Sequence, residues 1–146
     1  LLGLVPRHRR LRAPSAPDWA DARCGGGRVR AKDAVGRYGE QVAVTHLLAA
    51  GWEVLDRNWR GRSGELDVVA LEGDELVVVE VKTRSGDGFG HPAEAVTASK
   101  LARLRRLAGE WLHEHDVRPA AVRVDVVAVR TSRRGAATVE HLRGVL

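Results

Sequence analysis

Residues 64–82 read GELDVVALEGDELVVVEVK, and this stretch decides the fold. Two Val/Leu-rich runs, Leu66–Leu71 and Leu76–Val81, have the length and composition of β-strands. Between them, residues 72–75 (EGDE) carry turn chemistry, with Gly73 free to adopt a positive φ angle. Apolar residues occupy both faces of the two strands, so we expect a β-hairpin that is covered on both sides.

The register of this hairpin brings charged residues together. If Gly73 and Asp74 form a two-residue loop, paired positions sum to 147, and Asp67 lies opposite Glu80 while Glu65 lies opposite Lys82. Side chains two residues apart share a face, and directly opposed Cβ atoms are about 4.5–5.5 Å apart. Two carboxylates held this close in a covered hairpin require a partner or a cation. Carboxylate and carbonyl oxygens with water suit Mg²⁺ or Mn²⁺.

The same residues resemble a known catalytic core. Asp67 followed by Glu80-Val81-Lys82 resembles the motif of the PD-(D/E)XK nuclease superfamily, although Leu66 stands where the superfamily name has proline. The wider pattern, GELDVVA followed by VVVEVKTR, resembles the YraN family of uncharacterised bacterial proteins. The resemblance runs from about Gly36 to Val129. It implies an α/β fold with a restriction-endonuclease-like core, in which helices flank a central mixed β-sheet.

The resemblance also implies roles for individual residues. Asp67, Glu80 and the carbonyl of Val81 would bind Mg²⁺ or Mn²⁺, and Lys82 would orient the attacking water or neutralise developing negative charge. Glu65 would contact and support Lys82 from the directly opposite position on the neighbouring strand if the register holds. The reaction implied is hydrolysis of a phosphodiester bond in DNA, for example in branched recombination or repair intermediates, or in RNA.

A first helix is expected over residues 33–50, and Glu40 falls on its apolar face. Taken alone, Glu40 is equally well explained as a boundary residue that reaches solvent or Arg37. The resemblance implies that it leans into the metal site, as a first-helix glutamate does in Holliday-junction resolvases. Gly36 and Gly39 are poor helix formers that would permit a close backbone approach there. The expected inward stripe is Val44, Leu47, Leu48 and Gly51.

The remaining elements follow from periodicity and turn residues. We expect a short strand at 52–56, a basic connector at 57–62, a helix from Thr97 to about His115, and strands at 122–130 and 138–143. Asp125 interrupts an apolar strand, and we expect it to form a structural ion pair. The loop at 83–92 would form a lip over a substrate, and His91 within it is expected to be structural. Candidate nucleic-acid contacts are Arg84, Lys100 and Arg103, against the simpler interpretation of a solvated face.

Composition limits the alternatives. Residues 1–32 contain Lys32 and seven arginines against two aspartates, a formal charge of +6, so residues 33–146 carry −1 of the total +5. The first segment has no sustained periodicity and is expected to be a disordered basic tail. Because the chain contains no Met, the native start could lie further in, near Val29 or Val35; contact of the tail with phosphates is the alternative. Residues 33–146 would form the single domain.

Three classes of function remain open from the sequence. The first is the metal-dependent nuclease, the second a non-catalytic nucleic-acid-binding module on a nuclease-like fold, and the third an interaction domain without a nucleic-acid role. One cysteine, Cys24, excludes an internal disulfide and agrees with a reducing cytoplasm. No apolar run approaches the roughly 20 residues of a membrane helix. Junction-cutting members of the superfamily are dimers, so the resemblance raises a homodimer as an assembly to test.

Overall fold

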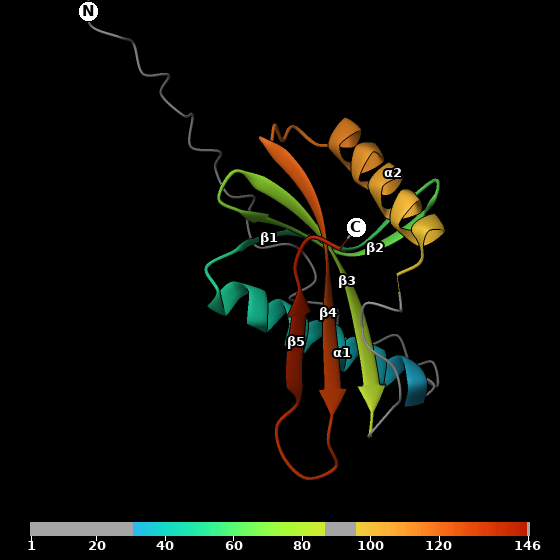
Figure 1. Ribbon diagram of the computed structural model, residues 1–146, viewed down its shortest axis with the longest axis vertical. Coiled ribbons are helices and arrows are strands. Elements are labelled where there is room, and N and C mark those ends of the chain that lie inside the picture. The colour runs from blue at the N-terminus through green and yellow to red at the C-terminus, as the bar shows by residue number, and fades with distance from the viewer. Residues whose placement is uncertain (1–30, 87–95, 146) are drawn as a thin grey trace, which may run out of the picture.

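The computed structural model describes residues 31–86 and 96–145. Its elements, in chain order, are α1 (Ala31–Ala49), β1 (Glu53–Gly61), β2 (Gly64–Glu72), β3 (Glu75–Ser85), α2 (Ala98–Glu114), β4 (Ala121–Thr131) and β5 (Thr138–Leu142). Figure 1 shows the strands as one strongly twisted sheet, with α1 and α2 as separate layers against it. The expected mixed α/β architecture is therefore confirmed.

The five strands lie in the order β1-β2-β3-β4-β5. Successive pairs are antiparallel except for β3 and β4, which are parallel along their whole length from Glu75–Ala121 to Ser85–Thr131. A parallel pair requires a crossover, and α2 provides it. This connection places the carboxyl ends of β3 and β4 at the same edge of the sheet (Figure 1).

Each face of the sheet has its own hydrophobic core. The α1 face buries Ala43, Val44 and Leu47 against alternate valines of β2, β3 and β4. The α2 face buries Leu104, Leu107 and Trp111 against the other set of alternating residues, including Val69 and Val78. Coverage on both sides explains why the hairpin strands are apolar at nearly every position, as the sequence predicts.

The hairpin has the predicted turn and register. Gly73 adopts a φ angle of +61°, and the pairs from Glu72–Glu75 to Val68–Val79 all sum to 147. The second helix also begins as expected, since the Thr97 side chain caps it by accepting a hydrogen bond from the Lys100 N–H at 3.2 Å.

Two expectations about the first part of the chain are wrong. The basic connector is not a connector: β1 runs on through residues 57–61, which pair with β2. Arginine-rich composition hid this edge strand, none of whose residues is fully buried. Leu48 and Gly51 are exposed rather than part of the inward stripe, Leu48 by 54%, and Ala43 lies in the core beside Val44 and Leu47. Gly51 ends the helix with a φ angle of +84°, as expected.

Asp125 forms the structural ion pair that the sequence predicts. It is completely buried, and its carboxylate accepts hydrogen bonds from Arg123 Nε, His141 Nε2 and the Gly144 N–H, each at 2.8 Å. These contacts hold its pKa below the usual range, although burial alone would raise it. Arg123 in turn binds Glu75 at the hairpin turn, 2.6 Å away. The cluster therefore fastens β4 and the carboxyl-terminal segment to the turn end of the sheet.

The helices of the described part are all too short or too polar to cross a lipid bilayer. Three expectations lie outside the described residues: the basic tail at 1–30, most of the expected lip, and His91.

Candidate functional site

The site forms where β2 and β3 separate. Their regular pairing ends at Val68–Val79, and the next donor on β3, the Val81 N–H, binds the Asp67 side chain instead of the backbone of β2, with 2.8 Å to Oδ2. Leu66 and Val69 are three residues apart, yet both lie in the core beneath α2. Strict alternation of faces is therefore interrupted around Asp67.

The carboxyl group of Asp67 has a raised pKa. Its pKa is raised from 3.8 to about 7, chiefly by burial and then by the neighbouring carboxylates of Glu80 and Glu40. The hydrogen bond from Val81 and the charge of Lys82 oppose it only in part. A bound cation would stabilise the ionised form of such a carboxyl group.

Glu80 is the second carboxylate of the site, and it is almost fully buried, with 7% of its surface exposed. Its Oε1 contacts two ammonium groups, Lys82 Nζ at 2.9 Å and Lys100 Nζ at 2.5 Å. Lys82 is two residues along β3, whereas Lys100 comes from the first turn of α2. The two lysines together offset the charge of one buried carboxylate.

The two lysines differ in acidity. Burial lowers the pKa of Lys100, and the nearby ammonium of Lys82 lowers it further. Burial also acts to lower the pKa of Lys82, but its ion pair with Glu80 and the nearby charge of Asp67 raise the pKa overall. The Glu80 carboxylate therefore favours the charged form of Lys82.

Helix α1 brings Glu40 to the same place. Gly39 packs so closely on β3 that an added Cβ would lie 1.8 Å from Thr83 Oγ1, which confirms a close backbone approach at this glycine. Gly36 has no atom within 4 Å of such a Cβ, so the expectation is wrong there. Glu40 Oε2 accepts a hydrogen bond from Asn58 Nδ2 at 3.1 Å.

These residues line one open pocket of about 620 Å³. Its walls come from the start of α1, from β2 at Asp67 and from the last part of β3. Glu40, Asp67, Glu80, Val81 and Lys82 all line it, so the structure brings together every residue for which the sequence predicts a catalytic or metal-binding role.

The expected position of Glu65 is wrong. Glu65 pairs with Arg60 on β1, and its Oε2 lies 3.4 Å from Arg60 Nε. Lys82 is directed to Glu80 instead. The prediction assumed that Glu65 and Asp67 share a face through two-residue alternation. Alternation is interrupted beside Asp67, so Glu65 does not lie opposite Lys82.

The predicted nucleic-acid contacts lie around the pocket. Lys100 and Arg103 line a second, basic pocket of about 540 Å³ at the start of α2, together with Arg106. Because Lys100 also contacts Glu80, it connects this basic surface to the carboxylates. Arg84 is exposed on β3 two residues beyond Lys82 and lies beside Arg130 in the parallel register.

Sequence reasoning missed two parts of the site. Asn58 is held in β1 with a φ angle of +50°, and its contact with Glu40 joins the edge strand to α1. An Asn among arginines in a predicted connector gave no signal of this. The contact between Lys100 and Glu80 was also missed, since it joins a helix to a strand and leaves no local pattern.

The donor chemistry of the pocket fits a hard divalent cation. Asp67 and Glu80 offer carboxylate oxygens, and Mg²⁺ in proteins is commonly held by one or two carboxylates, with water and substrate phosphates completing its coordination. No group of three or more His, Cys, Asp or Glu side chains forms a ready metal site within residues 31–86 and 96–145. Two carboxylates would leave most of the coordination sphere of such an ion to water or substrate.

Comparison with known proteins identifies the family. The model of the uncharacterised protein family UPF0102 matches residues 39–129. A UPF0102 protein of Beutenbergia cavernae is 65% identical over 117 residues, which cover 80% of this chain and 99% of the relative. The chain belongs to family UPF0102. A UPF0102 protein of Streptomyces coelicolor is 54% identical over 123 residues, covering 83% of this chain and 95% of the relative.

Membership in UPF0102 confirms the resemblance to the YraN family. The matched segment includes all the pocket residues from Glu40 to Ser85, as well as α2 and most of β4. The candidate site is therefore part of the domain that defines UPF0102.

Proposed function

We propose that this protein is a metal-dependent nuclease of the PD-(D/E)XK type, which hydrolyses phosphodiester bonds in DNA or RNA. One observation carries the proposal: Asp67 and Glu80 converge where β2 and β3 separate, beside Lys82 and in an open pocket. Burying carboxylates together costs free energy. A bound cation that a phosphate can also reach would offset this cost.

The roles of the residues follow from their positions. Asp67, Glu80 and the Val81 carbonyl would hold the ion, with Glu40 of α1 in the same pocket available to a second ion or its water. A bound Mg²⁺ supplies a water of lowered pKa and stabilises charge on the phosphate. Lys82 would donate hydrogen bonds to the attacking water or to a phosphate oxygen. Hydrolysis adds water across one P–O bond, with the hydroxyl on phosphorus and the proton on the leaving oxygen.

A second function has a specific observation in its favour. The charge of Glu80 is already offset by Lys82 and Lys100 without any metal. A non-catalytic nucleic-acid-binding module would use the same carboxylate only to hold two cationic side chains in place. Such a module would bind nucleic acid with a strong salt dependence but would not cleave it.

A cleavage assay on the full chain tests the proposal. Labelled branched, flapped, single-stranded and double-stranded DNA and RNA are incubated with Mg²⁺, Mn²⁺ or EDTA, beside the variant Glu80→Ala. We expect cutting that requires the metal and is lost in the variant. No cutting of any substrate, combined with no rise of the melting temperature in Mg²⁺ or Mn²⁺, would reject the nuclease and favour the binding module.

A further inference from the structure

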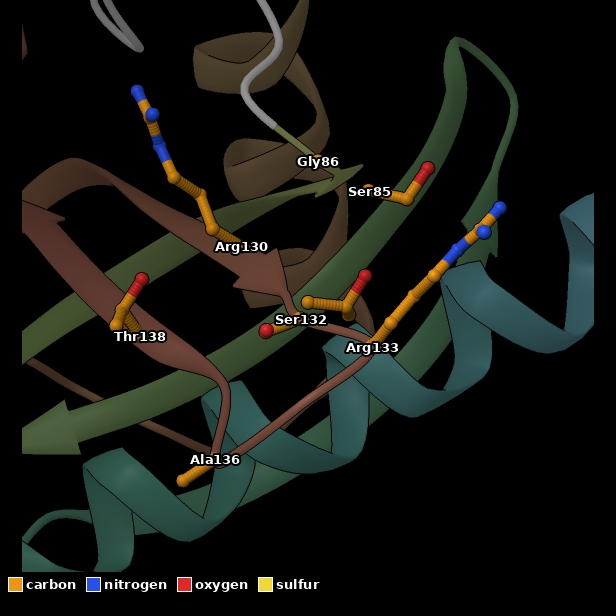
Figure 2. A pocket seen from close by; sticks show the side chains of 8 residues that line it. Ser85, Gly86, Arg130, Ser132, Arg133, Ala136 and Thr138 are labelled. Carbon is orange, nitrogen blue, oxygen red and sulfur yellow. The ribbon is translucent and has the colours of Figure 1, made fainter.

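A third pocket lies next to the candidate site, at the carboxyl ends of β3 and β4. It has a volume of about 640 Å³ and shares Ser85 with the pocket that holds Asp67 and Glu80. Its polar lining consists of two arginines and four hydroxyl residues: Arg130, Arg133, Ser85, Thr131, Ser132 and Thr138. Figure 2 shows the guanidinium groups of Arg130 and Arg133 on either side of Ser85 and Gly86.

The two arginines are available to an anion. Both are exposed, and neither forms an ion pair with a carboxylate of residues 31–86 or 96–145. Arginine guanidinium groups bind phosphate oxygens with two parallel hydrogen bonds. An anion in the pocket would therefore find two guanidinium groups in its lining, those of Arg130 and Arg133.

The local backbone holds the pocket in shape. The Ser132 hydroxyl accepts a hydrogen bond from the Arg134 N–H and donates one to the Arg134 carbonyl, both at 3.1 Å, which closes the turn that carries Arg133. Thr131 Oγ1 donates to the Arg84 carbonyl at 3.4 Å and ties β4 to β3. These contacts fix the position from which Arg133 projects, so part of the ordering needed to bind an anion is already present.

We propose that this pocket binds a backbone phosphate of a nucleic-acid strand whose scissile phosphate lies at Asp67 and Glu80. The inference rests on the proposed function and adds a second phosphate position beside it. The shared Ser85 makes the two pockets neighbours at the carboxyl end of β3. The part of the lining that falls within residues 31–86 and 96–145 contains no aromatic side chain, and these residues offer charge and hydrogen bonds to phosphate. Phosphate contacts carry no sequence information, so we expect the subsite to bind strands without sequence preference.

Equilibrium binding in EDTA tests the subsite without requiring cleavage. The full chain and the double variant Arg130→Gln/Arg133→Gln are titrated with a labelled dinucleotide and with a single strand of about twelve nucleotides, a length in the range of single-strand sites. We expect the long strand to lose affinity by about tenfold or more in the variant. We expect the magnitude of its salt slope to fall by about 0.7, the value for one phosphate contact on a single strand. The matched control Arg118→Gln changes an exposed arginine near the turn end of the sheet and should leave both values unaltered.

Two other outcomes would overturn the phosphate subsite. Wild-type affinity and salt slope for the long strand in the double variant would overturn the subsite. Binding of inorganic pyrophosphate that depends on both arginines, without any binding of strands, would also overturn it and indicate a small-anion pocket. The two proposals fail separately: a double variant that still cuts but binds the long strand as the wild type does rejects only the subsite. Loss of strand affinity in a protein that never cuts rejects only the nuclease.

Discussion

Gly39 and Thr83 are in such close contact that the space for a side chain on Gly39 is already filled by the Thr83 side chain. A Cβ added to Gly39 would lie 1.8 Å from Thr83 Oγ1 and 2.7 Å from both Thr83 carbon atoms Cβ and Cγ2. Thr83 follows Lys82 on β3, and Glu40 follows Gly39 on α1. The contact therefore fixes the distance between the helix that carries Glu40 and the strand that carries Glu80 and Lys82.

Gly39→Ala should damage both the fold and the site. Overpacking of this kind typically costs about 1–3 kcal/mol, and here the helix must move away from β3 to relieve it. We expect a lower free energy of unfolding, measured by urea denaturation, and a lower cleavage rate because Glu40 moves with α1.

Gly36→Ala is the matched control on the same helix. A Cβ there meets no atom within 4 Å, so the change should raise stability by about 0.5–1 kcal/mol through helix propensity. Equal effects of the two substitutions would show that the Gly39 contact does not position α1.

Asp67→Asn should stabilise the metal-free protein at alkaline pH. The pKa of Asp67 is raised from 3.8 to about 7, so the folded state binds an extra proton between these values and loses stability as the pH rises through them. Above pH 7, the free energy of unfolding of the wild type in EDTA is therefore lowered by the full cost of burying ionised Asp67. We expect the melting temperature of the variant to exceed that of the wild type more at about pH 8 than at about pH 5. A difference that does not depend on pH would contradict the raised pKa.

Glu80→Gln should destabilise the fold by leaving two ammonium groups close together without a carboxylate. Removing one member of a buried ionic cluster costs about 3 kcal/mol, and the partial exposure of Lys82 and Lys100 makes this an upper value. Adding Lys100→Met to the variant removes one of the two charges and should restore part of the loss. A double-mutant cycle by chemical denaturation measures this coupling, and strictly additive effects would mean that Lys100 and Glu80 do not interact.

Asp125→Asn should lower stability without acting on the site. Asp125 is fully buried, and its variant weakens the contacts to Arg123 and His141 at a cost of about 3–5 kcal/mol. Because the pKa of Asp125 is held below its usual value, its contribution is present above about pH 4 and is lost as the pH falls further. The variant should therefore differ most from the wild type near neutral pH. If it folds, the cleavage rate at a temperature well below melting should match the wild type.

The parts of the fold predicted from sequence are those with short-range causes. A two-residue turn at Gly73 sets the predicted hairpin register as far as Val68–Val79. Asp67 and Glu80 lie just beyond the regular pairing and are neighbours in the pocket. Glu65 was misplaced because alternation is interrupted at Asp67, where a side chain replaces the backbone as hydrogen-bond acceptor. Lys100 was predicted as a nucleic-acid contact near the site, but its contact with Glu80 was not. That contact and the one from Asn58 to Glu40 depend on tertiary packing, for which local sequence carries no signal.

The rate of Mg²⁺-dependent cleavage by the full-length wild type and by Asp67→Asn, under single-turnover conditions at about pH 8, tests the central claim most directly. The account predicts that the wild type cuts and that the variant is slower by about a hundredfold or more, although the variant is at least as stable in EDTA. Cleavage by Asp67→Asn at the wild-type rate would contradict the account, because the carboxylate of Asp67 would then have no part in the reaction.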